Sequence, residues 1–284
     1  MKTILLTTDF SKNAWNAIVY AVTLYKDEAC TFHILNAYTP AFYRIDYFVG
    51  GPVQSAIPDV GVDISLAGLE RTLMKLKKEY ANSKHQFKTI SAFNTLTEQI
   101  KASSETINAD LVIMGTQGAT GAKEIFLGSN TVHVALTSKT PVMAVPAKYK
   151  FTKMKRVLLP TAYDGFYNEH ELQPLLSLIQ NFDATLHVLH AVENDVLTKT
   201  QASHKAHLAK QLASIEVVWQ DITKEYMPNV VHEYADKNDI DLVVMMNRKH
   251  SFLERLLLKQ NVEAIGYHSA VPFMVLRDTS KKVT

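Results

Sequence analysis

The sequence contains little cysteine, no long hydrophobic run and almost no excess of charge. Its 284 residues include one cysteine, Cys30, which excludes an internal disulfide and a multi-cysteine metal site within one chain. No apolar run reaches the ~18 residues that a membrane helix needs, and Met1–Leu6 is typical of a first strand rather than of a signal peptide. A net charge of +2 argues against a large basic face. We therefore expect a cytoplasmic protein that has neither a membrane nor nucleic acid as a partner.

Short apolar runs alternate with segments of helical periodicity along the first half of the chain. The pattern predicts strands at Lys2–Thr8, Thr31–Tyr38, Gln86–Ala92, Leu111–Met114 and Val142–Val145. It predicts helices at Asn13–Tyr25, Leu66–Asn82, Thr95–Ile107 and Asn130–Ser138. Ser11 is a good N-cap for the first helix, and Asn94 or Thr95 for the third. Such alternation indicates an α/β fold, with an open parallel sheet covered by helices on both faces.

One long segment, Pro40–Val62, interrupts this pattern. It is aromatic, contains Gly50-Gly51-Pro52, and lacks a helical or strand period. We expect an extended loop that covers a site or contacts a partner.

From Phe151 onward the same order of segments begins again. Four segments mirror the strands of the first half, and these segments are Lys155–Thr161, Asp183–Ala191, Asp241–Met245 and Pro272–Leu276. The chain is also long enough for two domains of roughly 140 residues. The sequence therefore predicts an internal duplication, with domains at residues 1–148 and 153–279 and a boundary in the polar segment Lys148–Lys155.

The segment Ala109–Val145 combines a strand, a glycine-rich loop, a helix and another strand. Its glycines are Gly115, Gly118, Gly121 and Gly128. A loop of this kind lets backbone N–H groups approach a phosphate closely, and the N-terminus of the next helix favours negative charge. The alternative is a plain turn at the end of a strand.

The second half repeats the frame of this loop without its glycines. Gly115, Gly118, Gly128 and Ser129 align with Met246, Lys249, Lys259 and Gln260, and Asp9 aligns with Ala162. We expect a degenerate, mainly structural second copy, in which the basic residues Arg248, Lys249 and His250 retain only a general attraction for anions. Since the same frame occurs without the glycines, a ligand explains them better than the architecture does.

The spacing Gly115-x2-Gly118-x9-Gly128-Ser129 resembles the nucleotide-binding motif of the universal stress protein family. Thr7-Thr8-Asp9-Phe10-Ser11 is similar to that family's Pro-Thr-Asp-Phe-Ser start, from which Thr7 departs. The resemblance covers nearly the whole chain as a tandem of two domains. It implies two open five-stranded parallel sheets of order 3-2-1-4-5, with ATP or AMP bound at the carboxyl ends of the strands.

The same resemblance assigns roles to individual residues. Glycine and neighbouring backbone N–H groups would surround the ribose and phosphates, and the Ser129 hydroxyl would add a donor. Asp9 would lie near the ribose or a nucleotide-bound Mg²⁺, and the backbone of Ala37, just after the second strand, would contact the adenine edge. The implied nucleotide site consists of Thr7, Thr8, Asp9, Ala37, Met114, Gly115, Gly118, Gly128, Ser129, Asn130 and Thr131.

Several alternatives stay open at this point. Asp9 is also explained as a turn residue, and His33 and His187, at equivalent places inside strands, as packed core side chains. No strong catalytic base is implied, so the hypotheses are a nucleotide-binding regulatory protein, a slow ATPase or phosphotransferase, and a scaffold with a vestigial site. The edge strand Val142–Val145 could pair with Phe273–Leu276 as an internal pseudo-dimer, and a further homodimer is possible.

Overall fold

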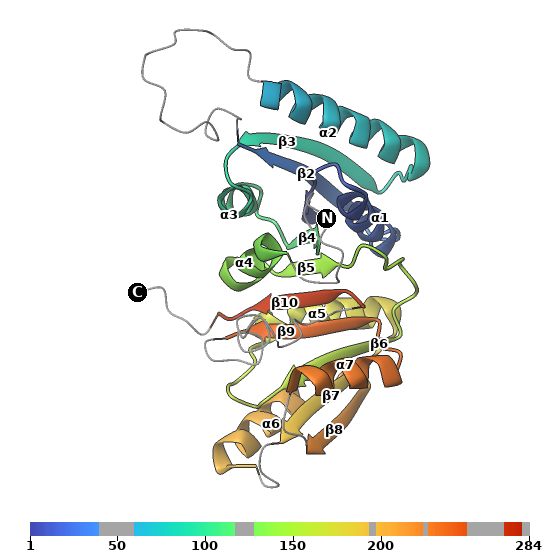
Figure 1. The fold of residues 1–284 in the computed structure, drawn as a ribbon. Helices are drawn as coiled ribbons and strands as arrows, with labels where there is room; N and C mark the ends of the chain where they lie inside the picture. The colour runs from blue at the N-terminus through green and yellow to red at the C-terminus, as the bar shows by residue number, and fades with distance from the viewer. Residues whose placement is uncertain (40–59, 117–127, 193–196, 224–226, 249–269, 280–284) are drawn as a thin grey trace, which may run out of the picture.

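The two halves of the chain share one sheet. The computed structural model describes residues 1–39, 60–116, 128–192, 197–223, 227–248 and 270–279. Their strands form a single ten-stranded sheet in the order β3-β2-β1-β4-β5-β10-β9-β6-β7-β8 (Figure 1). The first five strands repeat as the second five with opposite polarity. The predicted order 3-2-1-4-5 is confirmed in both halves.

The five strands of the first half are parallel to one another. They are β1 (Lys2–Thr7), β2 (Cys30–Tyr38), β3 (His85–Phe93), β4 (Leu111–Gly115) and β5 (Val142–Val145). The central strands β1, β4 and β5 have continuous apolar cores, as expected for parallel strands that are covered on both faces, whereas the edge strand β3 is polar at several positions and less buried.

Four helices connect these strands. They are α1 (Lys12–Leu24), α2 (Val60–Glu79), α3 (Leu96–Ile107) and α4 (Ser129–Thr137). The predicted caps are present, because Ser11 Oγ accepts from Ala14 N at 3.1 Å and Thr95 Oγ1 accepts from Glu98 N at 3.4 Å.

The predicted start of the second helix was wrong. It begins at Val60, not Leu66, so the irregular segment ends earlier than Val62. Gly61 and the β-branched residues beside it have low helix propensity, but tertiary contact overrides it. Ser65 is buried, and its hydroxyl lies 2.7 Å from that of Ser91 on β3. Residues 40–59 of the expected loop lie outside the described residues.

The second half repeats the same topology. Its strands are β6 (Arg156–Thr161), β7 (Thr185–Val192), β8 (Val217–Thr223), β9 (Leu242–Asn247) and β10 (Phe273–Arg277). Its helices are α5 (Glu169–Phe182), α6 (Lys199–Gln211) and α7 (Met227–Lys237). The register repeats as well, since Leu5 pairs with His33 in the first half and Leu158 with His187 in the second.

The halves are joined where β5 and β10 lie side by side at the middle of the sheet (Figure 1). The two strands are antiparallel, and Met143 lies opposite Met274. The predicted pairing of these two strands is therefore confirmed. Each strand covers an edge that the other domain would otherwise expose to unwanted pairing.

Successive side chains of each strand pack on opposite faces of the sheet. Ile4 and Leu6 belong to a core under α1 and α2 that continues into the second half through Val157 and Leu159. Leu5, between them, packs against α3 and α4. A third cluster spans the join and combines α4 and α7 with both central strands. One face of the sheet therefore has a core common to both domains.

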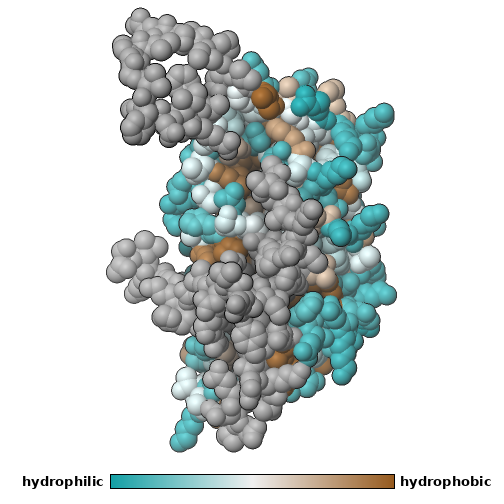
Figure 2. Space-filling view, in the orientation of Figure 1, coloured by the Kyte–Doolittle hydropathy of each residue, from teal (hydrophilic) through white to brown (hydrophobic). Residues whose placement is uncertain are grey.

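The surface of the molecule shows no extended hydrophobic area in the view of Figure 2, where brown patches are small and separate among hydrophilic side chains. Among the described residues, no helix is long and apolar enough to cross a membrane. Cys30, the first residue of β2, is buried, and its burial raises the pKa of the thiol to about 11. A buried thiol with a raised pKa is unreactive.

Candidate functional site

The candidate site lies at the carboxyl ends of β1 and β4, which are neighbours in the sheet. Here the strand order reverses, because the chain leaves β1 toward β2 and leaves β4 toward β5. In open α/β sheets this is where ligands bind, since loops on opposite faces diverge.

The turn between β1 and α1 is held by two side-chain hydrogen bonds. Thr8 Oγ1 accepts from Phe10 N at 3.0 Å, and Asp9 Oδ1 accepts from Ser11 N at 3.0 Å. Phe10 adopts a left-handed backbone with φ of 64°. Asp9 is therefore a turn residue, as one interpretation held, yet its carboxylate is exposed at the edge of the sheet. The two roles are compatible.

A buried asparagine that the sequence analysis missed supports this turn. Asn36 of β2 donates from Nδ2 to the carbonyl of Thr8 at 2.7 Å, and Thr8 N donates to Leu35 O at 2.9 Å. A polar residue inside an otherwise apolar strand was the available signal. The next residue, Ala37, lies within β2 opposite Ala92. The expectation that Ala37 follows the strand was therefore wrong, because β2 continues to Tyr38.

The residues on the two sides of the glycine-rich loop are hydrogen-bonded to each other. Gly128 N donates to Thr116 O at 2.7 Å, and Thr131 Oγ1 donates to Gly115 O at 3.1 Å. These bonds fasten the first turn of α4 to the end of β4. Gly118 lies outside the described residues. Thr116, which is buried, is a second supporting residue that the sequence analysis did not include.

The start of α4 presents backbone N–H groups without a side-chain cap. Its N-cap is Gly128, and no acidic residue occupies the first turn. Ser129 and Asn130 are exposed there. By contrast, hydroxyls of Ser11, Thr95 and Thr198 cap α1, α3 and α6. The first N–H groups of a helix need an outside partner, and an anion suits them.

The remaining predicted residues divide by exposure. Thr7, Thr8, Met114 and Thr131 are buried and support the site. The exposed members are Asp9, Ser129 and Asn130. The described residues contain no group of three or more His, Cys, Asp or Glu that could hold a metal ion.

Gly115 has a packing role that the comparison of the two halves did not reveal. A Cβ at this position would lie 2.6 Å from Asn13 Nδ2 and 2.8 Å from its Cγ. Asn13 is buried in the first turn of α1. The inference that a ligand explains the glycines better than the architecture does must therefore be amended for Gly115, which serves the close contact between α1 and β4.

The second domain keeps the turn but differs at the positions of Gly115 and Asn36. Thr161 Oγ1 accepts from Tyr163 N at 3.0 Å, and Tyr163 has φ of 52°, as in the first domain. Met246 replaces Gly115 and is buried. His190 occupies the place of Asn36, and its Nδ1 lies 3.3 Å from Asp221 Oδ1.

Arg248 was expected to attract anions, but its charge is used inside the protein. The side chain is buried, and the guanidinium lies 3.5 Å from Glu171 and 3.8 Å from Asp164. It also stacks 4.4 Å over the ring of Tyr167. Two carboxylates thus compensate it. Lys249, Lys259 and Gln260 lie outside the described residues.

Four histidines have packing or hydrogen-bonding roles inside the structure. His33 and His187 are buried as predicted, and burial lowers the pKa of both. Ring nitrogens of His204 and His207 donate to the carbonyls of Tyr163 and Tyr167, at 2.7 and 3.2 Å. These last two bonds hold α6 against the turn before α5.

Fold and site together define a tandem of two α/β domains, of which the first has an uncapped helix start beside the end of β4 and the second has Met246 in place of Gly115. The universal stress protein family model matches the chain twice, over residues 1–146 and 154–277. The chain belongs to the universal stress protein family and contains two domains of it.

Individual relatives agree with this assignment. Two universal stress proteins of Methanocaldococcus jannaschii, MJ0577 and MJ0531, are each 29% identical to the chain, over 158 and 146 residues. The alignments cover 52% and 51% of this chain and 96% and 81% of those proteins.

Solved structures resemble the whole tandem. A universal stress protein from Archaeoglobus fulgidus superposes with a TM-score of 0.67 at 18% identity, covering 97% of this chain and 98% of that one. One from Pseudomonas aeruginosa gives a TM-score of 0.60 at 13% identity, covering 98% and 93%. Both likenesses concern the fold.

Proposed function

We propose that the first domain binds an adenine nucleotide, ATP or AMP, and that the protein is a nucleotide-binding regulator in a stress response. The observation that carries the proposal is the start of α4. There, uncapped N–H groups adjoin Gly115 and the bond between Thr116 and Gly128, in a family whose nucleotide motif the glycine spacing resembles. Several backbone donors converging with a helix dipole favour a phosphate group.

The arrangement suggests how the parts of the ligand would be divided. The phosphates would lie against Gly128, Ser129 and Asn130, and the ribose would lie toward Asp9. The β2 end with Ala37 would take the adenine. Asp9 is a single exposed carboxylate, which suits a Mg²⁺ ion held mainly by the phosphates and water. The second domain would then be a structural partner without a nucleotide of its own.

Mass spectrometry of the small molecules released from freshly purified protein tests the proposal. We expect ATP, ADP or AMP at up to one molecule per chain. Gly118→Val should remove it, since a side chain would enter the phosphate space. A protein that neither carries nor binds an adenine nucleotide at millimolar concentration would refute the proposal.

A charge variant separates binding from folding. Ser129→Asp adds a carboxylate in the first turn of α4, where it stabilises the helix but repels phosphate. We expect nucleotide binding to be lost with thermal stability unchanged or higher. The matched control is Thr97→Asp in the first turn of α3, which should leave nucleotide binding intact.

A further inference from the structure

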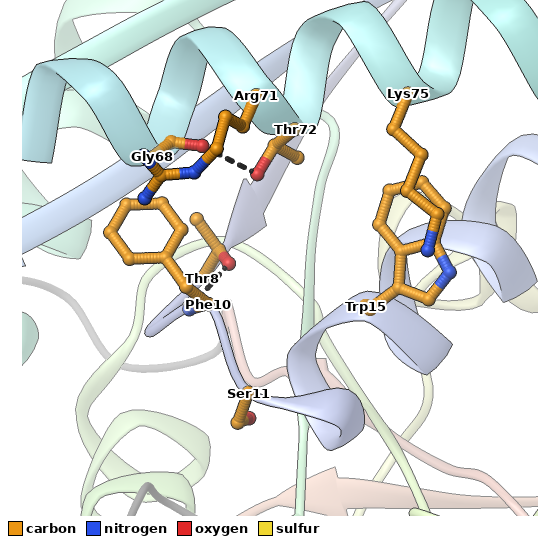
Figure 3. Close-up of a pocket in the computed structure, with 8 residues that line it drawn as sticks. All are labelled: Thr8, Phe10, Ser11, Trp15, Gly68, Arg71, Thr72 and Lys75. Carbon is orange, nitrogen blue, oxygen red and sulfur yellow. Dashed lines mark hydrogen bonds between the residues drawn. The ribbon is translucent and has the colours of Figure 1, made fainter.

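A cavity opens in the first domain, on the face of the sheet that α1 and α2 cover. It has a volume of about 200 Å³ and lies between the start of α1 and the middle of α2. Figure 3 shows Arg71, Thr72 and Lys75 extending from α2 toward Phe10 and Trp15. The cavity shares Thr8 with the predicted nucleotide site, but its cationic side chains come from α2, whereas the phosphate-accepting groups proposed for the nucleotide lie at the start of α4.

Helical spacing places the α2 residues in one row. Gly68, Arg71, Thr72 and Lys75 are separated by three, four and seven positions from the first, so they line the same face of the helix. Gly68 allows the row to approach α1 closely, because a Cβ there would lie 2.3 Å from the ring of Phe10. The cavity is therefore a defined space between two fixed helices.

The walls of the cavity combine positive charge with aromatic surface. Lys75 Nζ lies 3.9 Å from the centre of the Trp15 ring, and Phe10 forms the opposite wall. Among the described residues, no acidic side chain lines the cavity. Neither Arg71 nor Lys75 forms an ion pair with another described residue. Two neighbouring cations thus lack a compensating carboxylate within this part of the structure.

The hydroxyl groups of the cavity are also set to donate. Ser11 Oγ and Thr8 Oγ1 each accept a backbone N–H, from Ala14 and Phe10. Their own protons therefore remain for another acceptor. Donors and cations with no acidic group select an anion that has several acceptor oxygens, as a phosphate does.

The second domain shows the contrasting arrangement. There Lys205 of α6 lies over the rings of Tyr163 and Trp219, but its Nζ is 3.2 Å from Asp221. A carboxylate of the protein already compensates the cation. The open pair on α2 is a property of the first domain.

We propose that this cavity binds a small phosphate monoester, with the phosphate held by Arg71, Lys75 and the two hydroxyls. Its organic part would lie against Phe10 and Trp15. A cavity of about 150 Å³ accommodates benzene, so a single ring fits in the space available. A phosphate monoester carries close to two negative charges at neutral pH, which matches two cations.

Trp15 supplies a direct readout. The chain has two tryptophans, so Trp219→Phe leaves Trp15 as the only indole, at the wall of the cavity. Phenyl phosphate should change its fluorescence saturably, because the phosphate draws Lys75 away from the ring. Inorganic phosphate should bind more weakly than phenyl phosphate because it has no ring to contact the aromatic walls. Benzoate should also bind more weakly because it carries less negative charge.

Charge variants on one helix test the site. In the Trp219→Phe background, Arg71→Gln and Lys75→Gln should each raise the Kd for phenyl phosphate about tenfold, the effect of losing one charge-assisted hydrogen bond. Lys78→Gln removes the same charge from an exposed position on α2 outside the cavity and should change the Kd less than about twofold. An equal loss in all three variants, or no saturable signal with any probe, would overturn the proposal.

The nucleotide site is tested separately. Phenyl phosphate binding should survive Ser129→Asp, whereas its loss there would mean that the probe occupies the α4 edge and that the cavity is not a site. If ATP fails to bind but phenyl phosphate behaves as expected, only the proposed nucleotide function falls.

Discussion

The side chain of Asn13 fills the space beside Gly115, so that an added Cβ would lie 2.6 Å from its amide nitrogen. This contact joins the first turn of α1 to the last residue of β4. The start of α1 and the end of β4, which border the candidate site, are therefore packed on each other, and Gly115 makes room for this contact.

Gly115→Ala should lower the free energy of unfolding by about 1–3 kcal/mol, because the buried Asn13 must shift. Urea denaturation measures this free energy. The double variant Asn13→Ala/Gly115→Ala should be less destabilised than the sum of the losses in the two single variants. Nucleotide binding of the double variant then tells whether the ligand needs the glycine for itself. A Gly115→Ala protein as stable as the parent would show that Asn13 moves at no cost.

Asn36→Ala should destabilise the protein by about 1–3 kcal/mol, since the Thr8 carbonyl loses its partner in a buried place. It should also weaken nucleotide binding, because that carbonyl precedes Asp9. The matched control is Asn82→Ala, which removes an exposed amide bond to Lys26 O of 2.8 Å and should cost less. Equal losses of stability in both variants would contradict the supporting role of Asn36.

Met143→Ala should destabilise the molecule by about 2–5 kcal/mol, because Met143 is fully buried at the join of the two domains. Hydrogen exchange should become faster in β10 as well as in β5, since the strands share hydrogen bonds. Leu76→Ala is the control, because Leu76 of α2 is equally buried. It should leave the β10 amides comparatively protected from exchange. Unchanged exchange in β10 after Met143→Ala would mean that the domains are not coupled through this pair.

Acidification should destabilise the protein through His33 and His187. Burial lowers the pKa of each in the folded state, so the unfolded chain binds protons first as pH falls below about 6.5. Their contribution is complete above that pH and is lost progressively below it. Urea midpoints between pH 7.5 and 5.5 should fall less steeply in His33→Gln/His187→Gln than in the parent. The exposed His170→Gln should keep the parental slope, and an identical slope in the double variant would refute this origin.

Much of this architecture follows from local patterns in the chain. The strand Val142–Val145 was predicted at its observed bounds, and the Ser11 cap was predicted from residue type alone. The start of α2 was not predicted correctly. Gly61 has low helix propensity, and the contact of Ser65 with β3 that stabilises this part of the helix cannot be read from the sequence. The role of Asn36 was missed and that of Arg248 was misjudged. Their partners, the Thr8 carbonyl and Glu171, lie far away along the sequence and cannot be identified from neighbouring residues.

The sequence by itself determined the α/β class, the duplication and the glycine spacing, because periodicity, repetition and glycine content are local properties. Only the tertiary structure decided that β5 and β10 merge two sheets into one, that Gly115 makes room for Asn13, and that Arg248 is compensated internally. It also gathered Arg71 and Lys75 against Trp15 across more than fifty residues of chain. Those features are contacts between distant segments, whose energies exist only once the sheet has brought the segments together.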